Sequence, residues 1–117
     1  SKQMCDKPVA SEIWRLADVA AHWDQLMLTA SITENGEDVV YQEGPVTTML
    51  APEDLMAKFA AEDEAGGMQP GDLMMCGTLP AIGGVRPGSR FSFSLADPVL
   101  NQRISHAYDI VELPDWG

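Results

Sequence analysis

Apolar and polar residues alternate along three stretches of this chain, and the alternation predicts β-strands. Successive side chains of a strand point to opposite faces of a sheet, so a period of two is typical of a strand with one face on the core. The apolar members are Leu26, Leu28, Ala30 and Ile32; Phe91, Phe93 and Leu95; and Ile104, His106, Tyr108 and Ile110. A further strand over 39–42 is expected to pair with the first, because Asn35-Gly36 between them suits a type I′ hairpin turn.

One clear helix is predicted over residues 52–65. Pro52 occupies a first-turn position, where its missing N–H removes no hydrogen bond, and acidic residues follow at the positive end of the helix dipole. Gly66-Gly67 ends the helix. Apolar residues recur along one side of it, at Leu55, Met56, Phe59 and Ala60. We interpret this stripe as a face packed on the core rather than as a cofactor-binding face.

The stretch before the first strand contains weaker signals. Residues 9–16 suit either a strand or the start of a helix, and we favour the strand. Asp18 suits the N-cap of a short helix ending at Ala21, because its carboxylate can accept hydrogen bonds from the free N–H groups of a first turn. We therefore expect a strand and then one short helix here.

The stretch 69–95 concentrates the features that could form a binding site. Pro70-Gly71 suits a turn, and the unbroken apolar run 73–76 is typical of a strand covered on both faces. Cys76, inside that run, is expected to be buried and inert. Gly77-Thr78 ends the run and begins a glycine-rich loop that reaches Gly84. Such a loop can present a hydroxyl and backbone N–H groups to an anion, or it can simply connect two strands.

Composition excludes several classes of partner. The formal net charge is −11 at pH 7, and the seven basic residues are scattered, so neither a nucleic acid nor an anionic membrane finds a basic patch to bind. No apolar run is long enough to span a membrane. Cys5 and Cys76 lie far apart, which argues against a structural disulfide and favours a reduced, cytoplasmic setting.

Other candidate chemistry is sparse. The two histidines, His22 and His106, have no zinc-ligand spacing to the cysteines. His106 lies on an apolar strand face, where a hydrogen-bonded core histidine is expected more often than a base. The acidic run 62–64 is interpreted as a solvated helix end. The predicted fold class is mainly β (α+β), a mixed, mostly antiparallel, rolled β-sheet with one clear helix, forming one domain over residues 1–117.

Several motifs follow one another along the chain in a distinctive order. They are Pro70-Gly71-Asp72, the apolar run, Gly77-Thr78, Pro80, a glycine pair and Arg86-Pro87-Gly88, preceded upstream by the Asn35-Gly36 hairpin, Tyr41-Gln42 and the helix. This order resembles the C-terminal signature of the fumarylacetoacetate hydrolase family. The chain departs from that signature by having Cys76 in place of a threonine and by the insertion of Leu79 before Pro80. The resemblance implies the C-terminal part of that family's catalytic domain, from a divergent branch.

The resemblance also implies roles for three residues. Enzymes of the family act on 2-oxo or 1,3-dicarbonyl acids by C–C bond hydrolysis, decarboxylation or isomerisation, and use a divalent cation held by three carboxylates. Lys2 looks like the family's lysine beside the metal, and its alternative reading is a solvated terminal lysine. Thr78 looks like the threonine that holds the substrate carboxylate, with Gly77 supplying backbone beside it.

The cation itself is expected to bind outside this chain. The carboxylates that hold Mg²⁺, Mn²⁺ or possibly Ca²⁺ in the family would precede Ser1, so we expect no cation to be held by this chain alone and no activity from it in isolation. In the family fold, the missing part contributes strands to the same sheet, so without them the sheet edges of this chain would be unpaired. Unpaired edges predict a homo-oligomer formed through those edges. The alternative hypothesis is a non-catalytic, β-rich binding or oligomerisation module.

Overall fold

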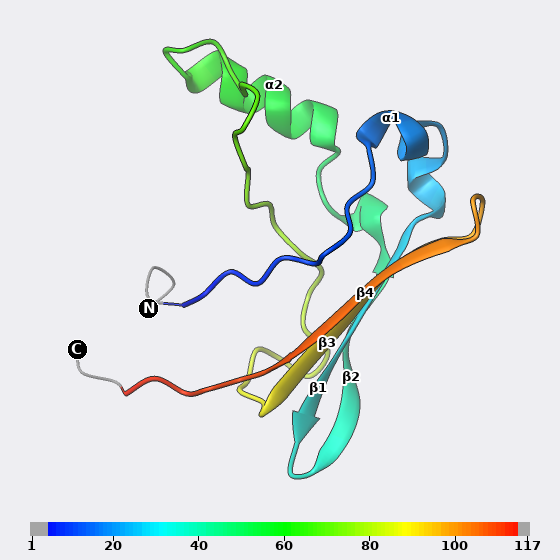
Figure 1. The fold of residues 1–117 in the computed structure, drawn as a ribbon, viewed down its shortest axis with the longest axis vertical. Coiled ribbons are helices and arrows are strands. Elements are labelled where there is room, and N and C mark those ends of the chain that lie inside the picture. The colour runs from blue at the N-terminus through cyan, green and yellow to red at the C-terminus, as the bar shows by residue number, and fades with distance from the viewer. Residues whose placement is uncertain (1–4, 115–117) are drawn as a thin grey trace.

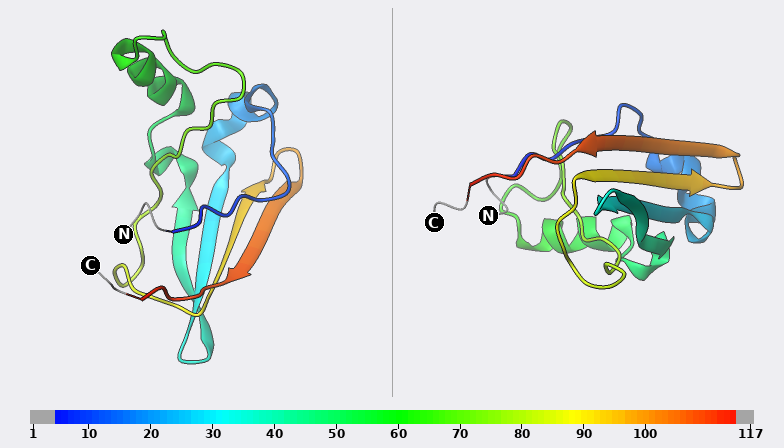
Figure 2. Two further views of the ribbon diagram at one scale, coloured as in Figure 1. Left: turned by 60° about the vertical axis from the view of Figure 1, so that its left-hand side comes forward. Right: turned by 90° about the horizontal axis from the view of Figure 1, so that it is seen from below.

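A four-stranded antiparallel sheet forms the centre of the molecule (Figure 1). The structure is a computed structural model, and it describes residues 5–114. The strands are β1 (Met27–Glu34), β2 (Glu37–Pro45), β3 (Arg90–Asp97) and β4 (Gln102–Asp109). They lie in the order β2-β1-β3-β4, so that β2 and β4 are the two edges (Figure 2). The predicted class, mainly β with some helix, is confirmed.

Two tight turns set the register of the sheet. Asn35 and Gly36 adopt φ values of 53° and 78° between β1 and β2, as the sequence predicts for this hairpin. Residues 98–101 form the turn between β3 and β4, and Asn101 there has a φ of 51°. Asparagine tolerates this left-handed conformation better than most residues, which explains its place at the end of the turn.

Short helices lie before β1 and after β2, and they differ from the prediction. They are α1 (Leu16–Val19), the 3₁₀ helix η1 (Ala20–Gln25) and the 3₁₀ helix η2 (Val46–Thr48). Residues 9–15 form no strand, so the strand we favoured there is wrong. Asp18 lies inside α1 and caps nothing: its carboxylate accepts 2.9 and 3.1 Å hydrogen bonds from Arg15, the residue at the N-cap.

The small core lies where these helices meet the end of the sheet. Val19, Leu26 and Val46 are buried together, and Leu26 is fully enclosed. The half-buried side chains packed against them include Trp14 and Trp23. One hydrogen bond, from Val46 N to Leu26 O at 3.1 Å, fixes η2 beside the start of β1. The core therefore joins the helical end of the molecule to the central strand.

The clear helix, α2 (Pro52–Glu62), begins where predicted and projects beyond the end of the sheet (Figure 1). It ends three residues earlier than predicted, because Asp63 already has the extended angles φ −95° and ψ 128°. None of its residues is buried, and Met56 and Phe59 are more than one-third exposed. The expected core stripe is therefore wrong. The return loop covers part of it at Gly67, where an added Cβ would lie 3.0 Å from Ala60 Cβ.

The segment 72–81 returns from α2 without regular structure, so the buried strand predicted over 73–76 is wrong as well. Leu73 and Met75 are 76% and 63% exposed, and Cys76 is an exposed free thiol. No neighbouring strand pairs with this segment, and its apolar run therefore meets solvent. Only Leu79 is buried, against Gly44 on β2.

A buried carboxylate joins η1 to the adjacent end of β3. Asp97, at the end of β3, is 1% exposed, and its Oδ2 accepts a 2.8 Å hydrogen bond from His22 Nε2. Gln102 donates to the same carboxylate, as do the backbone N–H groups of Val99 and Leu100. Burial alone would raise the pKa of Asp97, but these hydrogen bonds outweigh it and lower the pKa from 3.8 to about 2.

Among residues 5–114, no helix has both the length and the apolar character that crossing a membrane requires.

Candidate functional site

The two faces of the sheet differ in chemistry, and one of them carries the glycine-rich loop. Directly paired residues of antiparallel strands share a face. Across the sheet one such row runs from Gln42 on β2 through Ala30 and Phe93 to His106 on β4. The face that contains this row is called the inner face. Leu79, in the loop, contacts the same face at Gly44.

A β-bulge in the β1–β2 hairpin places the residues that receive the loop. Ala30 pairs with Gln42 and Ser31 pairs with Val40, so Tyr41 is an extra residue without an opposite number. The backbone oxygen of Tyr41 accepts a 2.7 Å hydrogen bond from Ile82 N. Gln42, the next residue, turns its side chain to the inner face and is 7% exposed. The bulge thus provides two adjacent attachment points for residues 78–82.

Thr78 lies at one of these attachment points. Gln42 Nε2 donates to Thr78 Oγ1 at 3.0 Å and to the backbone oxygen of Leu79 at 2.6 Å. Thr78 itself is exposed, and an added Cβ on Gly77 would meet nothing within 4 Å. The two predicted substrate-binding residues are therefore accessible, and one of them is held by a buried amide.

Several donors in the residues around Thr78 have no partner in the protein. The N–H groups of Gly77, Thr78 and Leu79 make no hydrogen bond within the part of the chain that the structure describes. The Thr78 hydroxyl also donates to no acceptor there. Gly77 and Thr78 are exposed whereas Leu79 is buried, and exposed donors without protein partners are the groups that an anion binds. The rim formed by residues 77–79 can therefore hold a carboxylate or a similar acceptor.

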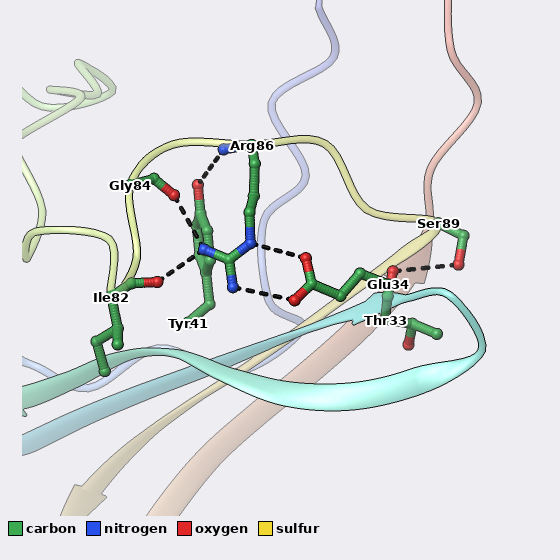
Figure 3. Close-up of polar contacts among 7 residues, drawn as sticks. All are labelled: Thr33, Glu34, Tyr41, Ile82, Gly84, Arg86 and Ser89. Atoms are coloured by element: carbon green, nitrogen blue, oxygen red, sulfur yellow. Dashed lines mark hydrogen bonds and ion pairs between the residues drawn. The ribbon is translucent and has the colours of Figure 1, made fainter.

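Arg86 fixes the second half of the loop, as Figure 3 shows. Its guanidinium donates to both carboxylate oxygens of Glu34, at 2.7 and 3.3 Å, and to the backbone oxygens of Ile82 and Gly84 at 2.7 and 3.0 Å. The hydrogen bonds from Arg86 lower the pKa of the Glu34 carboxyl. The guanidinium also lies 5.3 Å from the centre of the Tyr41 ring. Arg86 thus attaches the glycine-rich loop to the β1–β2 hairpin.

The end of the loop passes very close to β1. A Cβ added to Gly88 would lie 3.0 Å from the backbone oxygen of Thr33 and 3.1 Å from Ile32 Cβ. Ser89 N then donates to the Thr33 oxygen at 2.9 Å, just before β3 begins. The Ser89 hydroxyl donates to the same oxygen at 3.4 Å (Figure 3). Glycine at position 88 is required by this close approach, and the loop is therefore held at both ends.

Aromatic rings line the inner face on β3 and β4. Phe91 lies 5.6 Å from Tyr108 and 5.9 Å from Phe93, and Phe93 lies 5.9 Å from His106, measured between ring centres. All four side chains are half-buried, and burial raises the pKa of Tyr108. His106 makes ring contacts but no hydrogen bond among the described residues, so the expected hydrogen-bonded core histidine is wrong in that respect.

The opposite, outer face of the sheet carries small hydroxyl side chains. Thr29 and Ser31 on β1, Ser92 and Ser94 on β3 and Ser105 on β4 border a shallow hollow of about 400 Å³. A second hollow, of about 360 Å³, lies at the hairpin end beside Asn35 and Gly88. Neither hollow includes Thr78.

A comparison with models of protein families identifies a family for this chain. The family described as "Protein of unknown function (DUF2848)" has a model that matches residues 1–108. The chain belongs to this family. No curated protein and no solved structure matches the chain. The DUF2848 match includes both the rim and the Arg86 attachment, but the family description assigns no activity to either.

The structure separates the three residues singled out in this DUF2848 chain. Gly77 and Thr78 lie together on the rim. Lys2 lies outside the described residues, and its role beside a metal remains a prediction. Among residues 5–114, no three side chains of His, Cys, Asp or Glu come together in a group that could hold a metal ion.

Sequence reasoning missed the residues that support the rim. In the sequence, Gln42 and Arg86 stand out only as members of two motifs, Tyr41-Gln42 and Arg86-Pro87-Gly88. A glutamine at the end of a predicted strand is ordinarily exposed, and nothing in the residue pattern marks the bulge at Tyr41. The available signal is the opposite charge of Glu34 and Arg86, but these residues are 52 positions apart and nothing in the sequence shows that they meet.

Proposed function

We propose that this chain is the carboxylate-binding part of a metal-dependent enzyme acting on 2-oxo or 1,3-dicarbonyl acids, by C–C bond hydrolysis, decarboxylation or isomerisation. The observation that carries the proposal is the rim itself. The exposed residues Gly77 and Thr78 have a hydroxyl and two backbone N–H groups without protein acceptors, and Gln42 donates to Thr78 Oγ1 and to the Leu79 oxygen. A carboxylate only accepts hydrogen bonds, so it complements such a surface. The motif order that resembles the fumarylacetoacetate hydrolase family supports the same assignment.

The cation that this proposal implies does not fit the described residues. Hard divalent ions such as Mg²⁺, Mn²⁺ and Ca²⁺ require several oxygen ligands, usually carboxylates. Residues 5–114 offer no group of three acidic, histidine or cysteine side chains close enough to serve. The proposal therefore assigns no residue of this chain to the metal, and it expects the isolated chain to be inactive. A role for Lys2 near the cation is part of the proposal, as is a cytoplasmic location.

The decisive assay uses the whole enzyme that the proposal implies, this chain together with the segment that supplies the metal ligands. Acylpyruvates and oxaloacetate are offered as substrates, with and without Mn²⁺. Thr78→Val should lower kcat/KM by about tenfold or more, because it removes a hydrogen bond to a charged group. Thr47→Val, at an exposed threonine of η2, is the matched control and should leave kcat/KM unchanged. Equal values for the two variants, or turnover of none of these acids, would refute the proposal.

One observation favours the second candidate, a β-rich oligomerisation module without chemistry. The chain exposes 8756 Å², whereas a compact chain of 12.7 kDa exposes roughly 6,200 Å². Its radius of gyration is 16.1 Å, against about 13 Å for a compact chain of this length. The excess area is comparable to that buried in a large protein interface. A homo-oligomer that covers the β2 and β4 edges is therefore part of the proposal in either case.

A further inference from the structure

Gln42 is almost completely buried beneath the rim, and both protons of its amide are in use. Nε2 donates to Thr78 Oγ1 at 3.0 Å and to the Leu79 oxygen at 2.6 Å. A carbonyl oxygen can only accept a hydrogen bond, so the atom facing Leu79 must be the NH₂ group of the amide. The bond to Leu79 thus fixes the orientation of the amide, and with it the direction of the bond to Thr78.

That direction decides what the Thr78 hydroxyl can do. A hydroxyl has one proton and two lone pairs. The Gln42 amide nitrogen occupies a lone pair and offers no acceptor in return, so the Thr78 proton must point elsewhere. Thr78 is exposed, and no described residue accepts that proton. The hydroxyl is therefore presented outward as a donor, and the preceding residue, Gly77, is exposed with an N–H that has no acceptor among the described residues.

We propose that Gln42 is a positioning residue: it holds Thr78 as a directed donor, so that the 77–79 rim selects groups that only accept hydrogen bonds and rejects those that must also donate. This inference rests on the proposed carboxylate-binding role of Gly77 and Thr78, and it adds the origin of the selectivity. A 2-oxo acid satisfies the rim completely. The corresponding primary amide has two N–H groups, which would face the donors of the rim and leave both sides without an acceptor.

The test compares two small probes, pyruvate and pyruvamide, on this chain labelled with ¹⁵N. Binding is followed by the chemical shifts of the Gly77 and Thr78 amides. The wild-type chain is expected to bind pyruvate more tightly than pyruvamide by about tenfold or more, the size of one hydrogen bond to a charged group. Merely structural damage would change both affinities and leave their ratio intact, so the ratio is the informative quantity.

Gln42→Met removes the amide while keeping the length of the side chain and adding no charge. The Thr78 hydroxyl is then free to rotate, and the ratio of the two affinities is expected to fall several-fold towards one. Gln25→Met, at an exposed glutamine of η1, is the matched control and should leave the ratio unchanged. In a Thr78→Val background, where no hydroxyl remains to be positioned, Gln42→Met should have no further effect on the ratio.

A second measurement covers the case in which Gln42→Met does not fold. In the wild-type chain, the side-chain amide protons of Gln42 should shift together with the Gly77 and Thr78 amides as pyruvate is added. In Thr78→Val, which changes an exposed residue, the Gln42 protons should no longer respond. Coupled shifts that disappear with the hydroxyl support the positioning role, and unresponsive Gln42 protons in the wild-type chain refute it.

The outcomes distinguish the two proposals. If pyruvate binds at Gly77 and Thr78 with its preference over pyruvamide unaffected by Gln42→Met, the role of Gln42 is refuted and carboxylate binding stands. If pyruvate does not shift these amides at all, the carboxylate site is refuted, and the positioning role is refuted with it.

Discussion

His22 Nε2 lies 2.8 Å from Asp97 Oδ2, and this hydrogen bond joins the short 3₁₀ helix before β1 to the last residue of β3, across 75 positions of sequence. Asp97 is 1% exposed and also receives two backbone N–H groups of the β3–β4 turn. One carboxylate thus organises a turn and attaches it to the helical end of the molecule. Protonation of Asp97 should therefore lower the stability of the whole fold.

Acid is expected to destabilise the protein through Asp97. The folded-state pKa is about 2, below the ordinary 3.8, so the unfolded chain binds more protons in this range and stability rises with pH. The contribution is fully present above pH 3.8 and is lost as the pH falls through about 2. Urea unfolding of the wild-type protein between these limits should show the loss. Asp97→Asn should be less stable at neutral pH, and its stability should change less with pH; a pH dependence equal to that of wild type would contradict this.

Arg86→Lys is expected to release the glycine-rich loop while leaving the sheet intact. A lysine ammonium cannot reproduce the planar fork that contacts both Glu34 oxygens and two backbone oxygens at once. Limited proteolysis should cut the 82–88 loop several-fold faster. Arg103→Lys, which changes an exposed arginine whose guanidinium donates to the Ser94 hydroxyl, is the control. Equal cleavage in the two variants would show that Arg86 does not hold the loop.

Gly36→Ala is expected to lower the free energy of unfolding by about 1–2 kcal/mol, the cost of a left-handed conformation in a residue with a Cβ. Gly36 has a φ of 78°, and an added Cβ would meet nothing within 4 Å, so the cost is conformational rather than steric. Gly77 has equally open space without a positive φ, and Gly77→Ala should be close to neutral in stability. Chemical denaturation of both variants measures the difference, and a neutral Gly36→Ala would rule out the strained turn.

Leu26→Ala is expected to cost about 2–5 kcal/mol of unfolding free energy, the range for a large side chain removed from a closed core. Leu26 is 0% exposed and touches the hydrophobic cluster from α1 to η2. Ile13→Ala, at a side chain that is 84% exposed, should change stability by less than about 0.5 kcal/mol. Thermal unfolding of the two variants side by side provides the check. Similar effects would mean that the core lies elsewhere.

Light scattering after size-exclusion chromatography should give a mass that is a multiple of 12.7 kDa. Val40→Lys, on the edge strand β2, is expected to reduce the mass, because a lysine on an edge hinders pairing with another strand. Val99→Lys, in the β3–β4 turn, is the matched control, since both valines are about half-exposed. A wild-type protein that elutes as a monomer at all concentrations would contradict the proposed oligomer.

Local signals accounted for the sheet. The alternation at Leu26, Ala30 and Ile32 and the Asn35-Gly36 turn predicted β1 and its hairpin, because strand period and turn geometry depend on near neighbours alone. The start of α2 at Pro52 followed from the same kind of information. These features were confirmed since no distant contact was needed to create them.

Burial was predicted less well, because burial depends on what covers a segment. The run 73–76 and the stripe at Met56 and Phe59 are apolar enough for a core, yet nothing among the described residues covers them fully enough to bury them. Apolar character alone cannot reveal a missing neighbour. The rim was located from Gly77 and Thr78, but its support was not. Gln42 reaches it only because a bulge shifts the register of β2, and a bulge is invisible in the alternation.

Tyr41, the unpaired residue of the bulge, is dispensable for the hairpin but is required to attach the loop that carries the rim. Deleting Tyr41 would restore an uninterrupted ladder between β1 and β2, so the hairpin should survive. The same deletion would remove the oxygen that receives Ile82 and the ring beneath Arg86. One inserted amino acid therefore turns an ordinary β-hairpin into the attachment point of a loop that is distant in sequence. A chain without that insertion would keep the sheet but lose the support of the proposed binding site.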